Sequence, residues 1–181
     1  MLTNQASIFR RARFTTVGMQ IHLDASLPAT VIRDGSNLAS AWNDKSGRAR
    51  HMASSGTNRP TFQATGLGGL GALQFDGVDD FMTFSDQTLS YIAGRSFTLI
   101  YVASKPANNN TWVIGGTNTN TRTNLYAGNL TANTHRFGFL NDDQGSIVTA
   151  APAGTTEIYT MVYDLSNNQR TVRRNGVEVS K

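Results

Sequence analysis

Cysteine is absent from this chain of 181 residues, and charged side chains are scarce. Without cysteine there can be no disulfide, no thiolate nucleophile and no cysteine-ligated zinc. Charged residues make up 15% of the chain, against about 25% in an average soluble domain, so Asn, Thr, Ser, Gln and Gly must supply much of the surface. The apolar runs are far shorter than the roughly 20 residues that a membrane-spanning helix needs, so we expect no membrane partner.

Basic residues exceed acidic ones by 16 to 12, but most of them are scattered. Two clusters stand out, at 10–13 near the start and at 170–174 near the end of the chain. Neither cluster is interleaved with the aromatic side chains on which the bases of a single strand would stack. We therefore expect no nucleic-acid partner.

Short segments of period two dominate the chain from Gly18 onward. Met19, Ile21 and Leu23 alternate with polar residues, which is typical of a half-buried strand. Asn175-Gly176 predicts a tight hairpin, since both residues accept positive φ. The other expected strands are Leu73–Phe75, Phe81–Phe84, Phe97–Ala103, Thr111–Ile114, Asn124–Ala127, His135–Leu140, Ser146–Ala150, Glu157–Asp164, Arg170–Arg174 and Val177–Val179. Many short strands separated by turns indicate one all-β sandwich or barrel.

The first 17 residues lack this alternation and mix apolar with basic side chains. They form either a frayed end or an anchor that docks on a partner. We therefore divide the chain into an N-terminal arm or anchor, residues 1–17, and a β-sandwich domain, residues 18–181. The candidate partner-binding residues of the arm are Ile8, Phe9, Arg10, Arg11, Arg13 and Phe14.

Four segments occur in an order that is known from one family: Met19–Ser26, Ala41–Gly47, Asn58–Phe62 and Leu73–Phe81. Together they resemble the laminin G-like branch of the concanavalin A-like domains, as found in bacteriophage and bacterial surface proteins. The resemblance implies a two-sheet antiparallel jelly-roll sandwich. Similar domains continue with more strands past the hairpin at Asn175-Gly176, so the resemblance leaves three alternatives here: a fold shortened at its C-terminus, strands supplied by a partner, or a fragment.

The resemblance also guides the functional expectation, although one fold can host many functions. We expect a bacteriophage virion structural protein, such as a capsid decoration, head-fibre or tail-associated component, which is made in the host cytoplasm and carried on the extracellular particle. It would attach to other virion proteins and form a homo-oligomer. The alternative is a carbohydrate-binding module that adsorbs to host surface glycans.

An endoglycosidase is the weaker alternative, because it requires two carboxylates across a cleft. The chain has two glutamates, Glu157 and Glu178, and neither has a second acid two or four residues away along its strand. We interpret both as solvent-facing strand residues and expect no enzyme and no catalytic residue.

Metal and glycan sites have one candidate set each. Asp76, Asp79 and Asp80 offer the oxygen ligands that calcium prefers, but their spacing is not that of an EF-hand, so we expect no metal cofactor and keep calcium as the fallback. A glycan site would combine aromatic platforms with polar donors. The candidate glycan-binding residues are Trp112, Arg122, Asn124 and Tyr126.

The aromatic and aliphatic residues of the strongest strand segments predict the core. The expected core residues are Trp42, Phe75, Phe81, Phe97, Leu99, Tyr101 and Val162. The indole N–H of Trp42 is expected to find a carbonyl acceptor.

Overall fold

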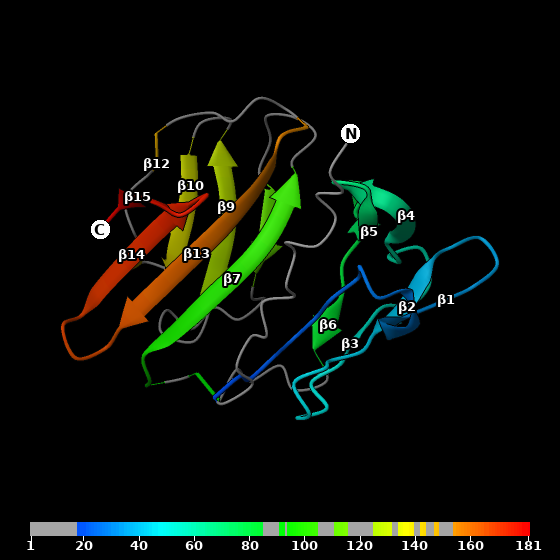
Figure 1. Ribbon diagram of the computed structural model, residues 1–181, viewed down its shortest axis with the longest axis horizontal. Coiled ribbons are helices and arrows are strands. Elements are labelled where there is room, and N and C mark those ends of the chain that lie inside the picture. Colours follow the sequence, from blue (N-terminus) through cyan, green and yellow to red (C-terminus); the bar gives the residue numbers. More distant parts are fainter. Residues whose placement is uncertain are drawn as a thin grey trace, which may run out of the picture.

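The computed structural model describes residues 18–84, 91–92, 94–104, 111–115, 125–131, 134–139, 142–143, 147–148 and 154–181. At 111–112, 129–131, 134–135, 142–143 and 147–148 it describes the backbone alone. The described residues are mostly β-strand, with antiparallel pairing throughout and no α-helix. They form two neighbouring parts, one built from β1 to β6 and the other from β7 to β15 (Figure 1).

The first part contains one four-stranded sheet and one two-stranded sheet. The four-stranded sheet has the order β1-β2-β3-β6, with β1 at Val31–Arg33, β2 at Ala39–Trp42, β3 at Met52–Ala53 and β6 at Thr83–Phe84. A 3-10 turn, η1 at Pro28–Thr30, leads into it. The two-stranded sheet pairs β4 at Thr61–Leu67 with β5 at Leu70–Gln74. A small core joins the two sheets, and its residues are Ala25, Val31, Ala39 and Phe62, with Trp42 and Leu73 packed against them.

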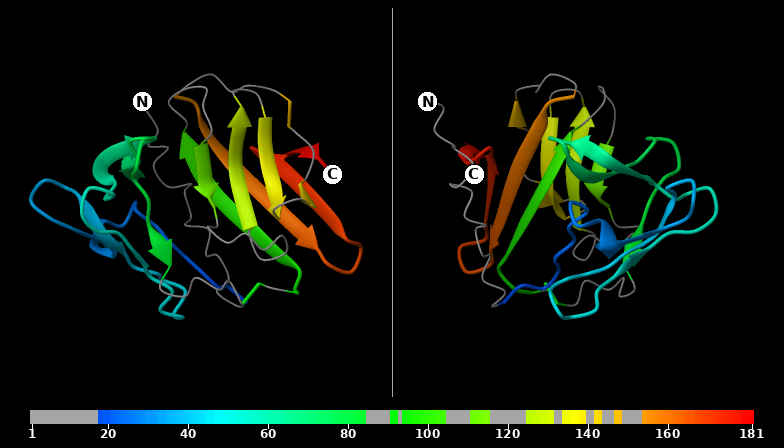
Figure 2. Two further views of the ribbon diagram at one scale, coloured as in Figure 1. Left: turned by 180° about the vertical axis from the view of Figure 1, so that it is seen from behind. Right: turned by 45° about the vertical axis from the view of Figure 1, so that its right-hand side comes forward.

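The second part packs two sheets face to face (Figure 2). One has the order β15-β14-β13-β7, with β7 at Phe97–Ser104, β13 at Thr156–Asp164, β14 at Gln169–Arg174 and β15 at Val177–Ser180. The other has the order β11-β10-β9-β8, with β8 at Thr111–Ile114, β9 at Leu125–Thr131, β10 at Thr134–Phe139 and β11 at Asp142–Asp143. A short strand, β12 at Ile147–Val148, also pairs with β10.

Period-two alternation explains the core between these sheets. Tyr159 and Met161 are buried on one face of β13, and Phe137 is buried on the facing strand β10. Phe97 lies edge-on to Phe137, with ring centroids 6.0 Å apart, which is a favourable aromatic geometry. The core is completed by Leu125, Ala127 and Val172.

The all-β class and the antiparallel pairing are confirmed. The predicted hairpin is also present: Asn175 and Gly176 have φ of 50° and 83°, and Arg174 pairs with Val177 across the turn. The prediction of two sheets over the whole chain is met in part, since two sheets pack on one core in the second part while the first part forms sheets of its own.

The strand predicted at Met19–Leu23 is wrong, because this segment is extended but pairs with no strand among the described residues. The loop at 44–50 supplies its hydrogen bonds instead. The N–H of His22 donates to Oδ1 of Asp44 at 2.8 Å, and the N–H of Lys45 donates to the carbonyl of His22. Arg50 donates to the carbonyl of Gln20 at 2.9 Å.

Two of the expected core residues are exposed, and a third is only half-buried. Phe75 is 44% exposed and Phe81 is 53% exposed, because β5 ends at Gln74 and both rings flank an exposed turn. Val162 alternates away from the core and is half-buried. The remaining expected residues, Trp42, Phe97, Leu99 and Tyr101, pack against the two cores. The indole N–H of Trp42 is buried and has no hydrogen-bond partner in the described part of the chain, which contradicts the expected carbonyl contact.

Candidate functional site

The face of the β7–β13 sheet that points away from the core carries apolar side chains. Since Tyr159 and Met161 point into the core, alternation directs Ile158 to the opposite face. Ile158 pairs with Val102 of the neighbouring strand β7. Ile100 is two residues before Val102 in β7 and therefore lies on the same face of the sheet. These three residues define the outer face, and they are 52% (Ile100), 51% (Val102) and 49% (Ile158) exposed. Three adjacent β-branched residues are thus about half open to solvent on one surface.

The strand at one margin of this sheet, β7, is also uncharged. It pairs with β13 on one side, and within the described residues no strand pairs with its other side. A strand edge without charge or proline lacks the usual protection against pairing with another chain. Both the outer face and its margin therefore suit contact with a further polypeptide.

Glu157 is buried, so its interpretation as a solvent-facing residue is wrong. Its carboxylate is on the core side of β13, where Oε2 accepts a hydrogen bond of 2.6 Å from the hydroxyl of Tyr159. Nε of Arg174 lies 3.4 Å from Oε1. The ring of Tyr101 stacks on Tyr159, with centroids 5.2 Å apart.

The electrostatics of this cluster keep its phenols neutral. Burial raises the pKa of Tyr159, and the hydrogen bond to Glu157 raises it further. Burial also raises the pKa of Tyr101, with smaller contributions from Tyr159 and Glu157. The cluster therefore presents a carboxylate held by a neutral phenol and a guanidinium, which is a stabilising arrangement inside the sheet.

Glu178 lies on the opposite face of the same sheet. Glu178 pairs with Arg173, and Arg173 pairs with Thr160 on its other side. The next row of paired residues contains Tyr159 and Arg174, and neighbouring rows point to opposite faces of the sheet. Glu157 thus faces the core and Glu178 faces solvent. The two glutamates cannot flank one glycosidic bond, as a glycosidase would require.

The three aspartates that were kept as fallback calcium ligands do come together. One carboxylate oxygen from each of Asp76, Asp79 and Asp80 lies within 4.8 Å of the others. We name the segment 76–80 the acidic turn. Hydrogen bonds inside the turn explain this gathering: Oδ1 of Asp76 accepts the N–H of Val78 at 2.8 Å and those of Asp79 and Asp80 at 3.3 Å. The N–H of Val78 lowers the pKa of Asp76 below its ordinary value of 3.8.

The candidate glycan residues are only partly placed. Arg122 and Asn124 lie outside the described residues, as do the six candidate partner-binding residues of the arm. Trp112 is in β8, where its backbone pairs with Gly128 of β9. Tyr126 is two residues before Gly128, but it is buried, so it is not an open aromatic platform.

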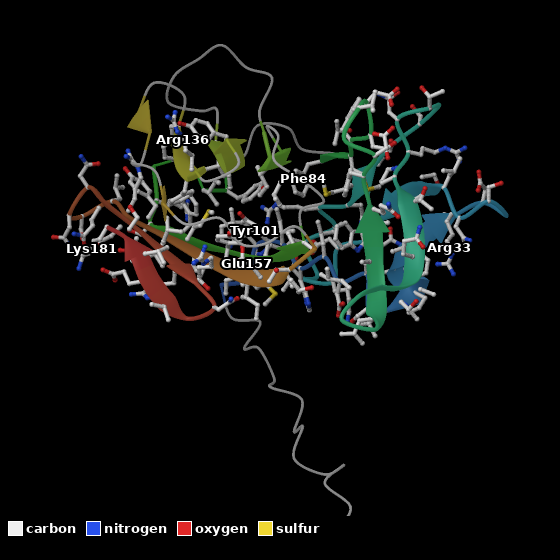
Figure 3. The ribbon with its side chains drawn as sticks, turned by 90° about the horizontal axis from the view of Figure 1, so that it is seen from above. Arg33, Phe84, Tyr101, Arg136, Glu157 and Lys181 are labelled. Carbon is white, nitrogen blue, oxygen red and sulfur yellow. The ribbon has the colours of Figure 1, made fainter. Side chains whose placement is uncertain are left out.

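Arg136 of β10 is a polar residue that the sequence interpretation missed. It pairs with Gly128, so the register aligns positions 112, 128 and 136 in one row across β8, β9 and β10. Arg136 lies on the side of β10 away from β13 (Figure 3). The sequence could have indicated Arg136, because it is next to the core residue Phe137 in an alternating segment and therefore points to the opposite face.

Comparisons of the chain with protein-family models, with curated protein sequences and with solved structures found no match. In the described part of the chain, no helix has the length and hydropathy required to cross a membrane. The functional argument therefore depends on the surfaces described above.

Proposed function

We propose that this chain is a structural component of a bacteriophage virion, such as a capsid decoration, head-fibre or tail-associated protein. It attaches to other virion proteins by a protein–protein surface and catalyses no reaction. Its two packed sheets would then be those of a concanavalin A-like, laminin G-like jelly roll. The virion setting rests on the resemblance of the four sequence segments, and the mode of action rests on the outer face.

The outer face is the single observation that carries the attachment mechanism. Ile100, Val102 and Ile158 are neighbours on one sheet face and keep about half of their surface in water. An isolated exposed apolar residue is ordinary, whereas neighbouring exposed apolar residues on one sheet face offer a surface that a partner can cover. Burial of such side chains contributes roughly 25 cal/mol per Å² when a partner covers them.

The test replaces all three outer-face residues with threonine, which keeps the preference for β-strand and adds a hydroxyl to each. We expect the triple variant Ile100→Thr, Val102→Thr, Ile158→Thr to fold and to be lost from purified particles, as measured by quantitative immunoblotting. Val177→Thr is the matched control, because Val177 is 66% exposed and lies off this face. Equal incorporation of the triple variant and the control would refute the proposal.

Carbohydrate binding is the second candidate, supported by the row of Trp112, Gly128 and Arg136. Gly128 has no side chain, so the middle of this row leaves room for a flat ligand against the backbone of the sheet. Binding of the chain to a glycan array, lost in Arg136→Ala but kept in the outer-face triple variant, would favour this candidate. No binding to any glycan would leave attachment to protein as the better account.

A further inference from the structure

The hairpin that joins β14 to β15 turns at Asn175-Gly176, and Asn175 is the only asparagine of the chain that is followed by glycine. Both residues are exposed. Beyond its chain neighbours, no heavy atom lies within 4 Å of the position that a Cβ on Gly176 would take. Because glycine has no side chain to hinder its peptide nitrogen, the nitrogen of Gly176 is open to approach by the side chain that precedes it.

The side chain of Asn175 is held against the neighbouring strand β13. Its Oδ1 accepts the N–H of Ile158 at 2.9 Å, and the backbone N–H of Asn175 donates to the carbonyl of Ile158 at 2.8 Å. The N–H of Ile158 polarises the side-chain carbonyl of Asn175 and is placed to stabilise a negative charge that develops on Oδ1. The amide carbon of Asn175 is therefore activated toward a nucleophile.

We propose that Asn175 is a site of spontaneous deamidation. The backbone nitrogen of Gly176 attacks Cγ of Asn175, a new C–N bond forms, and the bond from Cγ to Nδ2 breaks. The side-chain nitrogen takes up the proton of the Gly176 amide and leaves as ammonia, and the chain is left with a cyclic succinimide. Water then opens this ring at one of its carbonyl carbons, which gives either aspartate or isoaspartate at position 175.

The two products differ in what they do to the hairpin. Aspartate keeps the backbone and the hydrogen bond to β13, now with a charged acceptor. Isoaspartate adds one carbon to the main chain between positions 175 and 176, so the two-residue turn no longer matches the register of β14 and β15. In the unmodified chain that register pairs Arg174 with Val177, and Val179 packs against the core. Isoaspartate therefore releases β15 from the edge of the sheet.

Both products place a negative charge beside the outer face. Ile158, which belongs to the outer face, pairs with Val102 on one side and is hydrogen-bonded to Asn175 on the other. A carboxylate at position 175 must lose water when a partner covers this row, and that desolvation disfavours attachment. Deamidation therefore removes aged chains from the pool that can assemble. This consequence rests on the proposed function, whereas the modification itself does not.

The test incubates the folded full-length chain at mildly alkaline pH and maps its peptides by mass spectrometry. We expect a mass gain of about 1 Da at Asn175, with isoaspartate detected by methyltransferase labelling. Asn168 is the internal control, because it is also exposed and has a φ of 47°, against 50° for Asn175, but is followed by Gln169. We expect Asn175 to react at least about tenfold faster, since the side chain of Gln169 hinders the attacking nitrogen. Equal rates at the two positions, or no mass gain at Asn175, would overturn the proposal.

The variant Asn175→Gly separates deamidation from other effects of incubation, because glycine accepts a positive φ and has no side-chain amide to lose. After incubation, we expect the backbone amides of β15 to exchange with solvent at least about tenfold faster in the isoaspartate fraction of the wild type. We expect no change in Asn175→Gly. The same rate of exchange in both incubated proteins would refute the release of β15.

Particle incorporation is measured separately on the incubated wild type and on the incubated Asn175→Gly variant. We expect a loss of incorporation in the wild type alone. Equal incorporation of the two proteins, with the outer-face triple variant still lost from particles, would overturn the link between deamidation and attachment. Normal incorporation of the triple variant would instead overturn the proposed function, and the mass gain at Asn175 is independent of both results.

Discussion

Asp44 provides the sharpest test of how the first part of the chain is held together. Its side chain is 9% exposed, and each carboxylate oxygen accepts two hydrogen bonds. Oδ1 accepts the N–H groups of His22 at 2.8 Å and Ser46 at 2.9 Å. Oδ2 accepts the hydroxyl of Ser46 at 2.6 Å and the N–H of Arg50 at 3.0 Å. The carboxylate thus fixes the extended segment at 19–23 to the loop at 44–50.

The substitution Asp44→Ala removes all four acceptor contacts. Hydrogen bonds to a charged group contribute about 1.5 kcal/mol or more each, but burial of the carboxylate has its own desolvation cost, and water can enter the vacated site. We therefore expect a net loss of about 3 kcal/mol, or roughly 6–12 °C in melting temperature for a chain of this size. Asp24→Ala is the control, because within the described residues the carboxylate of Asp24 accepts hydrogen bonds from Ser26 alone, and we expect it to cost about 1 kcal/mol.

The pH dependence gives the same prediction an independent readout. Burial opposes ionisation of Asp44, but the four hydrogen bonds outweigh it and lower the pKa below the ordinary value of 3.8. A lowered pKa in the folded state contributes stability at pH values above 3.8, and this contribution is lost as the pH falls through the folded pKa. The gap in melting temperature between wild type and Asp44→Ala should therefore be full at pH 7 and shrink below pH 4. A full-sized gap that persists at pH 2.5, or a loss no larger than that of Asp24→Ala, would refute the reasoning.

Three further outcomes are expected. Phe75→Ala should cost about 1 kcal/mol because the ring of Phe75 is half exposed, whereas Phe137→Ala should cost about 3–5 kcal/mol because the ring of Phe137 is fully buried. Thermal melting measures both losses, and equal losses would contradict the assigned cores. Glu157→Gln should lower the free energy of unfolding by about 1–2 kcal/mol, because the group that accepts the hydrogen bond of the Tyr159 phenol loses its charge. The variant should leave any polysaccharide hydrolysis unchanged, and loss of hydrolysis would show that the protein is an enzyme. EDTA should not change the melting temperature, because hydrogen bonds already hold the acidic turn; a calcium-dependent rise would assign a metal to it.

Local features of the sequence determined several parts of this protein. Asn175-Gly176 made a hairpin because both residues tolerate positive φ, whatever packs around them. The alternation in 97–104 and 156–164 gave long paired strands. The acidic turn was also predictable, since an aspartate at position 76 can accept the backbone N–H groups of the residues that follow it in the turn.

Only the tertiary structure decided which face of each strand is covered. In β13 both alternating sets contain apolar residues, with Ile158 in one and Met161 in the other, so period two by itself cannot say which set is buried. Glu157 was misassigned for this reason. The phenol that binds it is two residues along the same strand, but the guanidinium of Arg174 arrives from the neighbouring strand β14, and packing decides that this face is the covered one.

The pairing partner of an extended segment is a non-local property as well. Met19–Leu23 has the pattern of a strand, but its backbone groups are bound by side chains and amides 22 to 30 residues further along the chain. The tie from Gln20 through Arg50 to Tyr91 spans three segments that no sequence pattern links. Sequence periodicity fixes the local geometry of a strand, whereas its partner and its buried face depend on which distant segments arrive beside it.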